Sequence, residues 1–79
     1  MTTLKNLLNI KEACVSARFR KDDSWKEAIN NAVIFNSKEE LENNKKALTD
    51  LIGNELFDDI ALGYAIRQIN WKLNNGLYH

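Results

Sequence analysis

The segment ELFDDIALGYAIRQINWKL, residues 55–73, carries two apolar stripes where an ordinary surface helix carries one. With about 100° between successive residues of a helix, its apolar side chains divide into two groups on roughly opposite sides. The first group is Leu56, Phe57, Ile60, Tyr64 and Trp71, and the second is Leu62, Ile66, Ile69 and Leu73. A helix that is apolar on two faces needs a neighbour on each side. The second neighbour is either another helix of this chain or another molecule.

The second group has spacings of four, three and four residues, which are those of a helix–helix seam. If the last helix lies at the centre of a bundle, both stripes are core. If it does not, the stripe is an interface, and the sequence predicts that a partner contacts Leu62, Ile66, Ile69 and Leu73. Trp71 would then serve as an anchor, because tryptophan is over-represented among interface hot spots. An Ile66→Glu change would unfold a core but only dissociate an interface.

The rest of the chain also favours helix, because it has no proline, few glycines and much Ala, Leu, Lys and Glu. We expect four helices, over residues 2–19, 25–34, 38–52 and 55–74. The predicted N-caps are Thr2 or Thr3 for the first helix, an aspartate of Asp22-Asp23 or Ser24 for the second, Ser37 for the third and Asn54 for the fourth. The predicted stop signals are Gly53 and Asn75-Gly76. Ser24 and Ser37 are each followed three residues later by a glutamate, which is the capping-box pattern.

The first helix is also broadly apolar. Leu4, Leu8, Val15 and Phe19 form one stripe, and Leu7, Ile10, Cys14 and Ala17 form an adjacent one. The fold class predicted is all-α, a small single-domain bundle of four helices over residues 1–79. The alternative is an α+β fold, because residues 15–20 alternate apolar and polar side chains as a strand does. In that alternative residues 13–20 and 32–35 pair as short strands.

A chain of 79 residues has a marginal core, and small domains usually gain stability from disulfides, a metal or a partner subunit. Cys14 is the only cysteine and His79 the only histidine, which excludes an internal disulfide and argues against a metal site. Oligomerisation, for example a homodimer, remains. No apolar run reaches the ~20 residues of a membrane span, and no signal peptide is evident. We therefore expect a soluble cytoplasmic protein.

The charges argue against nucleic acid as a partner. Eleven basic residues balance eleven acidic ones, with a net charge of +2 over residues 1–36 and −2 over residues 37–79. Neither half has the concentrated basic face that phosphate backbones require. Arg18 and Arg20, beside Lys21, are the best candidates for contacting an acidic partner. If residues 38–74 formed a helix-turn-helix, Asp59 would occupy a buried position and acids would open the recognition helix.

No set of residues in the sequence has the arrangement of a catalytic site. Cys14 has no nearby base to generate a thiolate. The pairs Asp22-Asp23 and Asp58-Asp59 are adjacent in sequence, so on a helix their carboxylates would diverge and would serve as caps instead. We therefore expect no enzymatic activity and no cofactor.

The function predicted is that of a non-enzymatic protein-interaction module that binds and regulates or inhibits a partner protein. Small inhibitors, immunity proteins and adaptors are of this kind. The alternative is a small dimeric helical transcriptional regulator that binds DNA or a nucleoid protein. Abundant Asn, Lys and Ile also indicates an A+T-rich gene, as many phages and mobile elements carry.

Overall fold

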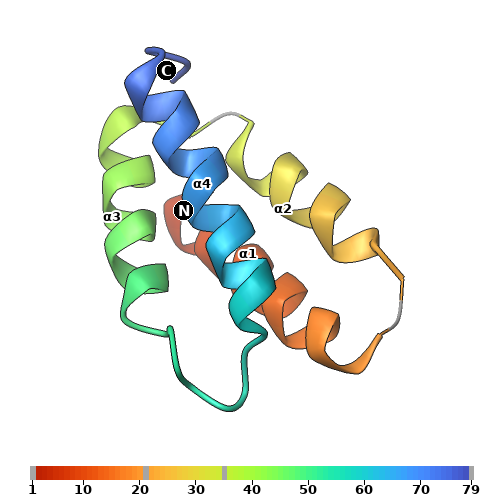
Figure 1. The fold of residues 1–79 in the computed structure, drawn as a ribbon. Helices are drawn as coiled ribbons and strands as arrows, with labels where there is room; N and C mark the ends of the chain where they lie inside the picture. Colours follow the sequence, from red (N-terminus) through yellow and green to blue (C-terminus); the bar gives the residue numbers. More distant parts are fainter. Residues whose placement is uncertain (1, 21, 35, 79) are drawn as a thin grey trace.

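The computed structural model describes residues 2–20, 22–34 and 36–78. It contains four helices: α1 (Thr2–Phe19), α2 (Ser24–Val33), α3 (Lys38–Thr49) and α4 (Asp59–Asn74). Figure 1 shows them as a compact bundle, and no strand occurs among the described residues. The all-α prediction is confirmed. The α+β alternative is wrong, because residues 13–19 lie within α1 and residues 32–33 within α2; Phe35 lies outside the described residues.

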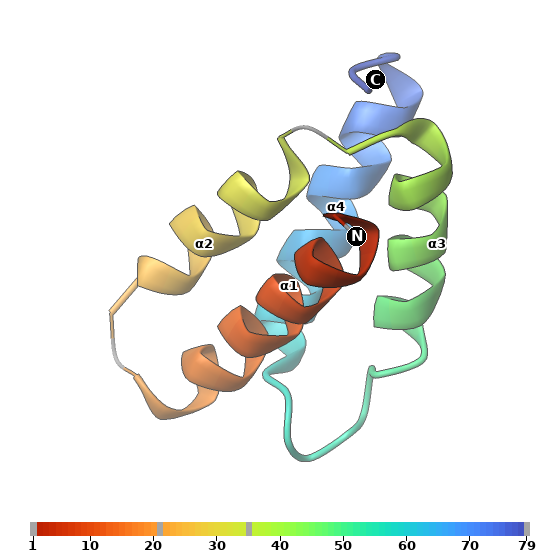
Figure 2. The ribbon, with the colours of Figure 1, turned by 180° about the vertical axis from the view of Figure 1, so that it is seen from behind.

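Helix α4 occupies the centre of the bundle. It packs against α2, α3 and α1, while α1 and α2 form the most extensive helix pair. Figures 1 and 2 show α4 running between α2 and α3, with α1 covering its other side. These neighbours bury the second apolar stripe of residues 55–73, whereas Leu56, Ile60 and Trp71 of the first stripe are exposed.

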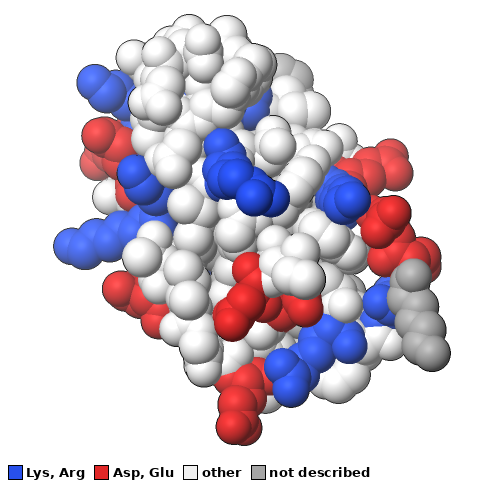
Figure 3. Space-filling view, in the orientation of Figure 1, with Lys and Arg blue, Asp and Glu red and all other residues white. Residues whose placement is uncertain are grey.

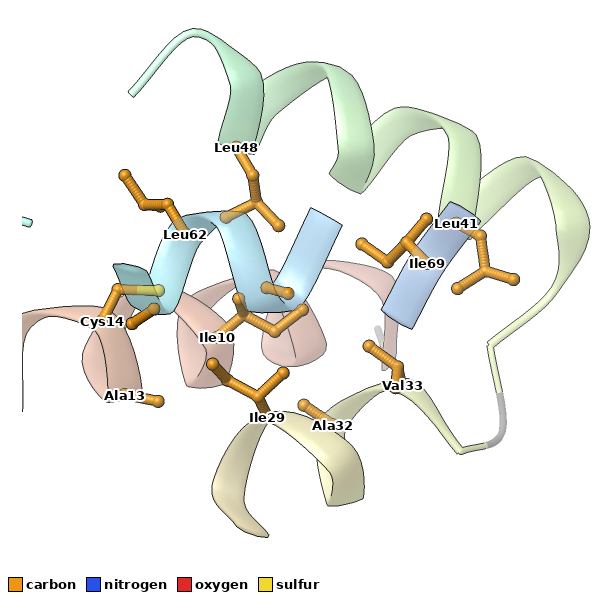
Figure 4. Close-up of a cluster of buried hydrophobic side chains, with 12 residues drawn as sticks. Ile10, Ala13, Cys14, Ile29, Ala32, Val33, Leu41, Leu48, Leu62 and Ile69 are labelled. Carbon is orange, nitrogen blue, oxygen red and sulfur yellow. The ribbon is translucent and has the colours of Figure 1, made fainter. Parts of the chain in front are cut away.

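The core draws side chains from all four helices (Figure 4). Its buried members are Ile10, Ala13, Cys14, Ile29, Ala32, Val33, Leu41, Leu48, Ala61, Leu62, Ala65 and Ile69. Leu62 and Ile69 of the second stripe have no exposed surface, and Ile66 and Leu73 are half-buried against the core. The second stripe is therefore core, but the interpretation that both stripes are core is wrong for the first one, because Leu56, Ile60 and Trp71 are exposed.

A buried polar cluster joins α1, the α2–α3 connection and α3. Asn36 donates from Nδ2 to the Ala32 carbonyl (2.7 Å), and Asn44 donates from Nδ2 to Asn36 Oδ1 (3.4 Å). The buried Glu40 carboxylate accepts a 2.6 Å hydrogen bond from Asn6 Nδ2. Among the described residues no buried side-chain nitrogen or oxygen lacks a hydrogen-bond partner. Because these groups are satisfied, their burial fixes the position of α3 against α1 without a large desolvation penalty.

The caps of α2 and α3 differ from each other. Ser37 caps α3 as predicted, its Oγ accepting from the Glu40 backbone N–H at 3.1 Å, although the Glu40 side chain turns to Asn6 instead of back to Ser37. The N-cap position of α2 is Asp23, an aspartate as one alternative predicted, although its side chain makes no cap hydrogen bond. The capping box predicted at Ser24 is wrong. Ser24 is the first residue of α2, and its N–H and hydroxyl both donate to Asp22 Oδ1. Because the Ser24 hydroxyl is used in this local hydrogen bond, it does not cap the backbone N–H groups of α2.

The α3–α4 connection is longer than predicted. Helix α3 ends at Thr49, and α4 begins at Asp59. Gly53 does adopt the predicted positive φ (+90°), four residues beyond the helix. Asn54 is not the cap of α4; its Oδ1 accepts from the Leu56 N–H in a local turn. The cap is Asp58, whose Oδ2 accepts from the Ala61 N–H at 2.9 Å.

We expect Asp58→Ala to lower the free energy of unfolding by about 1 kcal/mol, the usual contribution of an N-cap. Asn54→Ala removes only an exposed turn hydrogen bond, so a smaller loss is expected. Urea denaturation followed by circular dichroism measures both values. Equal losses in the two variants would contradict the assignment of Asp58 as the cap.

Candidate functional site

The described surface carries nine large apolar side chains that are substantially exposed. They are Leu8, Phe19, Ile34, Ile52, Leu56, Ile60, Trp71, Leu77 and Tyr78. Single exposed apolar residues are common, whereas clusters of them mark sites of interaction. Two clusters stand out, one along α1 and one at the C-terminal end of α4.

The outer face of α1, defined by Leu8, Lys11, Val15 and Phe19, points away from the bundle. Leu8 is 49 % exposed and Phe19 is 73 % exposed, whereas Ile10 on the opposite side of α1 is fully buried. These outward positions lie within an arc of about 80° at ~100° per residue. Helix α1 is therefore apolar on two sides, of which only one has neighbours in the bundle.

A shallow groove of about 400 Å³ follows this outer face. Leu8, Lys11, Glu12, Val15, Ser16 and Phe57 line it. Phe57 comes from the α3–α4 connection, which is attached to α1 by a 3.1 Å hydrogen bond from the Asp58 N–H to the Cys14 carbonyl. The connection thus adds an aromatic wall to a helical face.

Cys14 lies beneath this face and is fully buried. Burial first, and the nearby charge of Asp58 second, raise the pKa of its thiol to about 12. A thiol with this pKa holds almost no thiolate near neutral pH, and the thiolate is the reactive form. The geometry therefore agrees with the interpretation of Cys14 as a packing residue.

Arg18 lines a second hollow, of about 350 Å³, formed with the α3–α4 connection. Glu55, Asp58 and Asp59 share this hollow, so acidic side chains outnumber the basic one. The connection itself spans residues 50–58, whereas the turn of a helix-turn-helix has three or four residues. Neither the charge nor the spacing of α3 and α4 fits a DNA-reading motif.

Arg20 lies elsewhere, in a groove of about 460 Å³ between α1 and α2 that Glu12 and Trp25 also line. The two arginines therefore do not converge on one site. Hydrogen bonds from Ser24, more than the charge of Arg20, hold the pKa of Asp22 below its usual value. Figure 3 shows basic and acidic groups interspersed over the face that carries α4, with no extended field of one sign.

The C-terminal end of α4 presents aromatic side chains. Trp71 is 56 % exposed, and Leu77 and Tyr78 are exposed beyond the helix. Gly76 has a positive φ of +67°, and the Leu77 N–H donates to the Lys72 carbonyl at 2.8 Å, which is a Schellman motif. This motif turns the chain back over the last helical turn, where Trp71 lies. In Figure 3 the surface around this end of α4 is white over a broad area.

The two carboxylates of the Asp58-Asp59 pair hold different parts of the backbone. Asp58 accepts from the Ala61 N–H and Asp59 from the Gly53 N–H, so each carboxylate is used in holding the backbone. No group of three or more His, Cys, Asp or Glu side chains suited to a metal ion occurs in the described part of the chain. Over the same residues, no helix has the length and apolar character needed to cross a membrane.

The predicted partner-contact residues fall into three groups. Leu62 and Ile69 are fully buried, so their assignment to a partner surface is corrected to core. Ile66 and Leu73 are half-buried against the same core. Trp71, Arg18 and Arg20 are exposed, on separate parts of the surface. The outer face of α1 was not among the predicted contacts, although the sequence stripe Leu8–Val15–Phe19 signals it.

Comparison with known proteins gives no relative: no family model, no curated protein and no solved structure matches this chain.

Proposed function

We propose that this protein is a non-enzymatic interaction module that binds another protein and so regulates or inhibits it. The observation that carries the proposal is the exposed Trp71 at a surface end that also presents Leu77 and Tyr78. Tryptophan and tyrosine are the side chains most enriched at interface hot spots, and the centres of interfaces are depleted of charge. The white area around the C-terminal end of α4 in Figure 3 is likewise low in Lys, Arg, Asp and Glu.

A protein partner suits this surface better than DNA. Nucleic-acid binding depends on basic side chains that neutralise phosphates. The chain has a net charge of zero, and the hollow that holds Arg18 contains three carboxylates. For these reasons the alternative of a DNA-binding regulator has weaker support than that of a protein-binding one.

The experiment is affinity purification from native cell extract, followed by calorimetric titration of the identified partner. We expect Trp71→Ala to weaken binding by about 30-fold or more, which corresponds to the ~2 kcal/mol of a hot spot. Ile60→Ala is the matched control, because Ile60 is also an exposed apolar residue and lies near the opposite end of α4. It is expected to bind as the wild type does.

The partner's own activity distinguishes regulation from simple tethering. We expect that activity to change in proportion to the protein added and to level off at the binding stoichiometry. Unchanged binding by Trp71→Ala would contradict the assignment of this surface, and unchanged partner activity at saturation would contradict a regulatory role.

A further inference from the structure

The outer face of α1 is a second exposed apolar surface, separate from the end that carries Trp71. Leu8 and Val15 are seven residues apart and Phe19 follows four later, which is the spacing of a helix–helix seam. In Figure 2, α1 lies in front of α4, and no other described element covers it from that side. A seam of this kind fits another helix.

We propose that two copies of this chain associate through the outer faces of their α1 helices, packed side by side and parallel, with Val15 at the centre of the contact. The choice of a second copy rests on the charges beside the groove. Lys11 lies toward one edge of the face and Glu12 toward the other, and both line the groove. Within the described residues neither takes part in a salt bridge.

The symmetry of a dimer decides how these charges meet. In a parallel pair the two-fold axis runs along the helices, so each edge of one α1 faces the opposite edge of the other. Lys11 of each copy then lies beside Glu12 of the second copy, and the pairing occurs twice. In an antiparallel pair centred on Val15 like edges meet, so that Lys11 lies level with Arg18 of the second copy and like charges face each other. The charge pattern therefore favours the parallel dimer.

The contact is small, because Leu8 to Phe19 spans three helical turns, or about 16 Å. Interfaces of small area hold weak and transient complexes. We therefore expect a dimer that forms only as concentration rises, with affinity supplied by the apolar contact and orientation selected by the ion pairs.

Light scattering of the native protein from low to high micromolar concentration is the first test. The molar mass is expected to rise from the 9.1 kDa of the monomer toward twice that value. Val15→Glu is expected to remain monomeric and helical, because Val15 is only half-buried at the surface of the monomer. A wild type that stays monomeric throughout, or a Val15→Glu variant that still dimerises, overturns the proposal.

A charge exchange tests whether a second copy binds the outer face of α1, and in which orientation, without altering apolar packing. Lys11→Glu and Glu12→Lys are each expected to weaken dimerisation, since each sets like charges together. The double variant K11E/E12K is expected to restore it. Failure of the double variant to recover, with both single variants weakened and folded, overturns the parallel arrangement.

Cross-linking gives an independent measure of that arrangement. In the parallel dimer Val15 lies opposite its own copy, so Val15→Cys should form a disulfide-linked dimer under mild oxidation. The wild type is a control, because its only cysteine, Cys14, is buried. Ile60→Cys is a second control for collisional cross-linking. No more cross-linking for Val15→Cys than for Ile60→Cys overturns the proposal.

Discussion

The Ile69→Glu variant is expected to be unfolded at 25 °C. Ile69 is fully buried, where side chains of α3 and α4 meet those of α2 (Figure 4). A glutamate there places a charge in the core with no partner, and a buried unpaired charge costs several kcal/mol. The total stability of a small domain is only about 5–15 kcal/mol. Circular dichroism and one-dimensional NMR measure the loss of helix and of side-chain dispersion.

Ile60→Glu on the same helix is the matched control. Ile60 is 71 % exposed, so the new carboxylate stays in water and the midpoint of thermal unfolding should change little. Ile66→Glu is expected to fall between the two, because Ile66 is half-buried against the core. A folded Ile69→Glu variant with native-like dispersion would contradict the central position of α4.

Leu62→Ala is expected to lower the free energy of unfolding by about 2–5 kcal/mol, the range for truncating a buried leucine. Leu62 lies near Leu48 of α3 and Cys14 of α1 (Figure 4). The truncation would therefore leave a cavity that is bounded by two other helices. Because those helices are held by other contacts, we do not expect the cavity to close. Urea denaturation monitored by circular dichroism gives the difference.

Leu56→Ala serves as the comparison for the same chemical change at an exposed position. Leu56 is 64 % exposed on the α3–α4 connection, and we expect a change within about 0.5 kcal/mol, as is usual for surface substitutions. If the two leucine variants lose the same stability, Leu62 does not lie in the core.

Helix content was readily predicted, but helix ends were predicted unevenly. The Ser37 cap is confirmed, as is the end of the last helix before Gly76. The start of α4 was predicted four residues too early, because Asn54 and Asp58 are both good capping residues in sequence. The structure selects Asp58, whose backbone N–H also donates to the Cys14 carbonyl of α1. That hydrogen bond joins segments far apart in the chain, so local sequence carries no sign of it.

The candidate sites were predicted less well than the fold. Periodicity correctly identified two helices with a surplus of apolar surface, residues 2–19 and residues 55–73. Periodicity did not reveal which of these apolar stripes is buried in the folded chain. One of the two interpretations assigns the stripe of Leu62 and Ile69 to a partner, whereas the exposed positions belong to the stripe of Leu8 and Phe19 and to that of Leu56, Ile60 and Trp71.

By itself, the sequence of this protein determined the helical class, the order of four helices and the apolar sides of each one. These properties follow from propensity, capping residues and spacing, all of which act over a few residues. Only the tertiary structure decided that the stripe of Leu62 and Ile69 on α4 is buried, whereas that of Leu8 and Phe19 on α1 is exposed. Whether an apolar stripe is core or surface depends on which distant helices lie against it, and that choice is set by the packing of the whole chain.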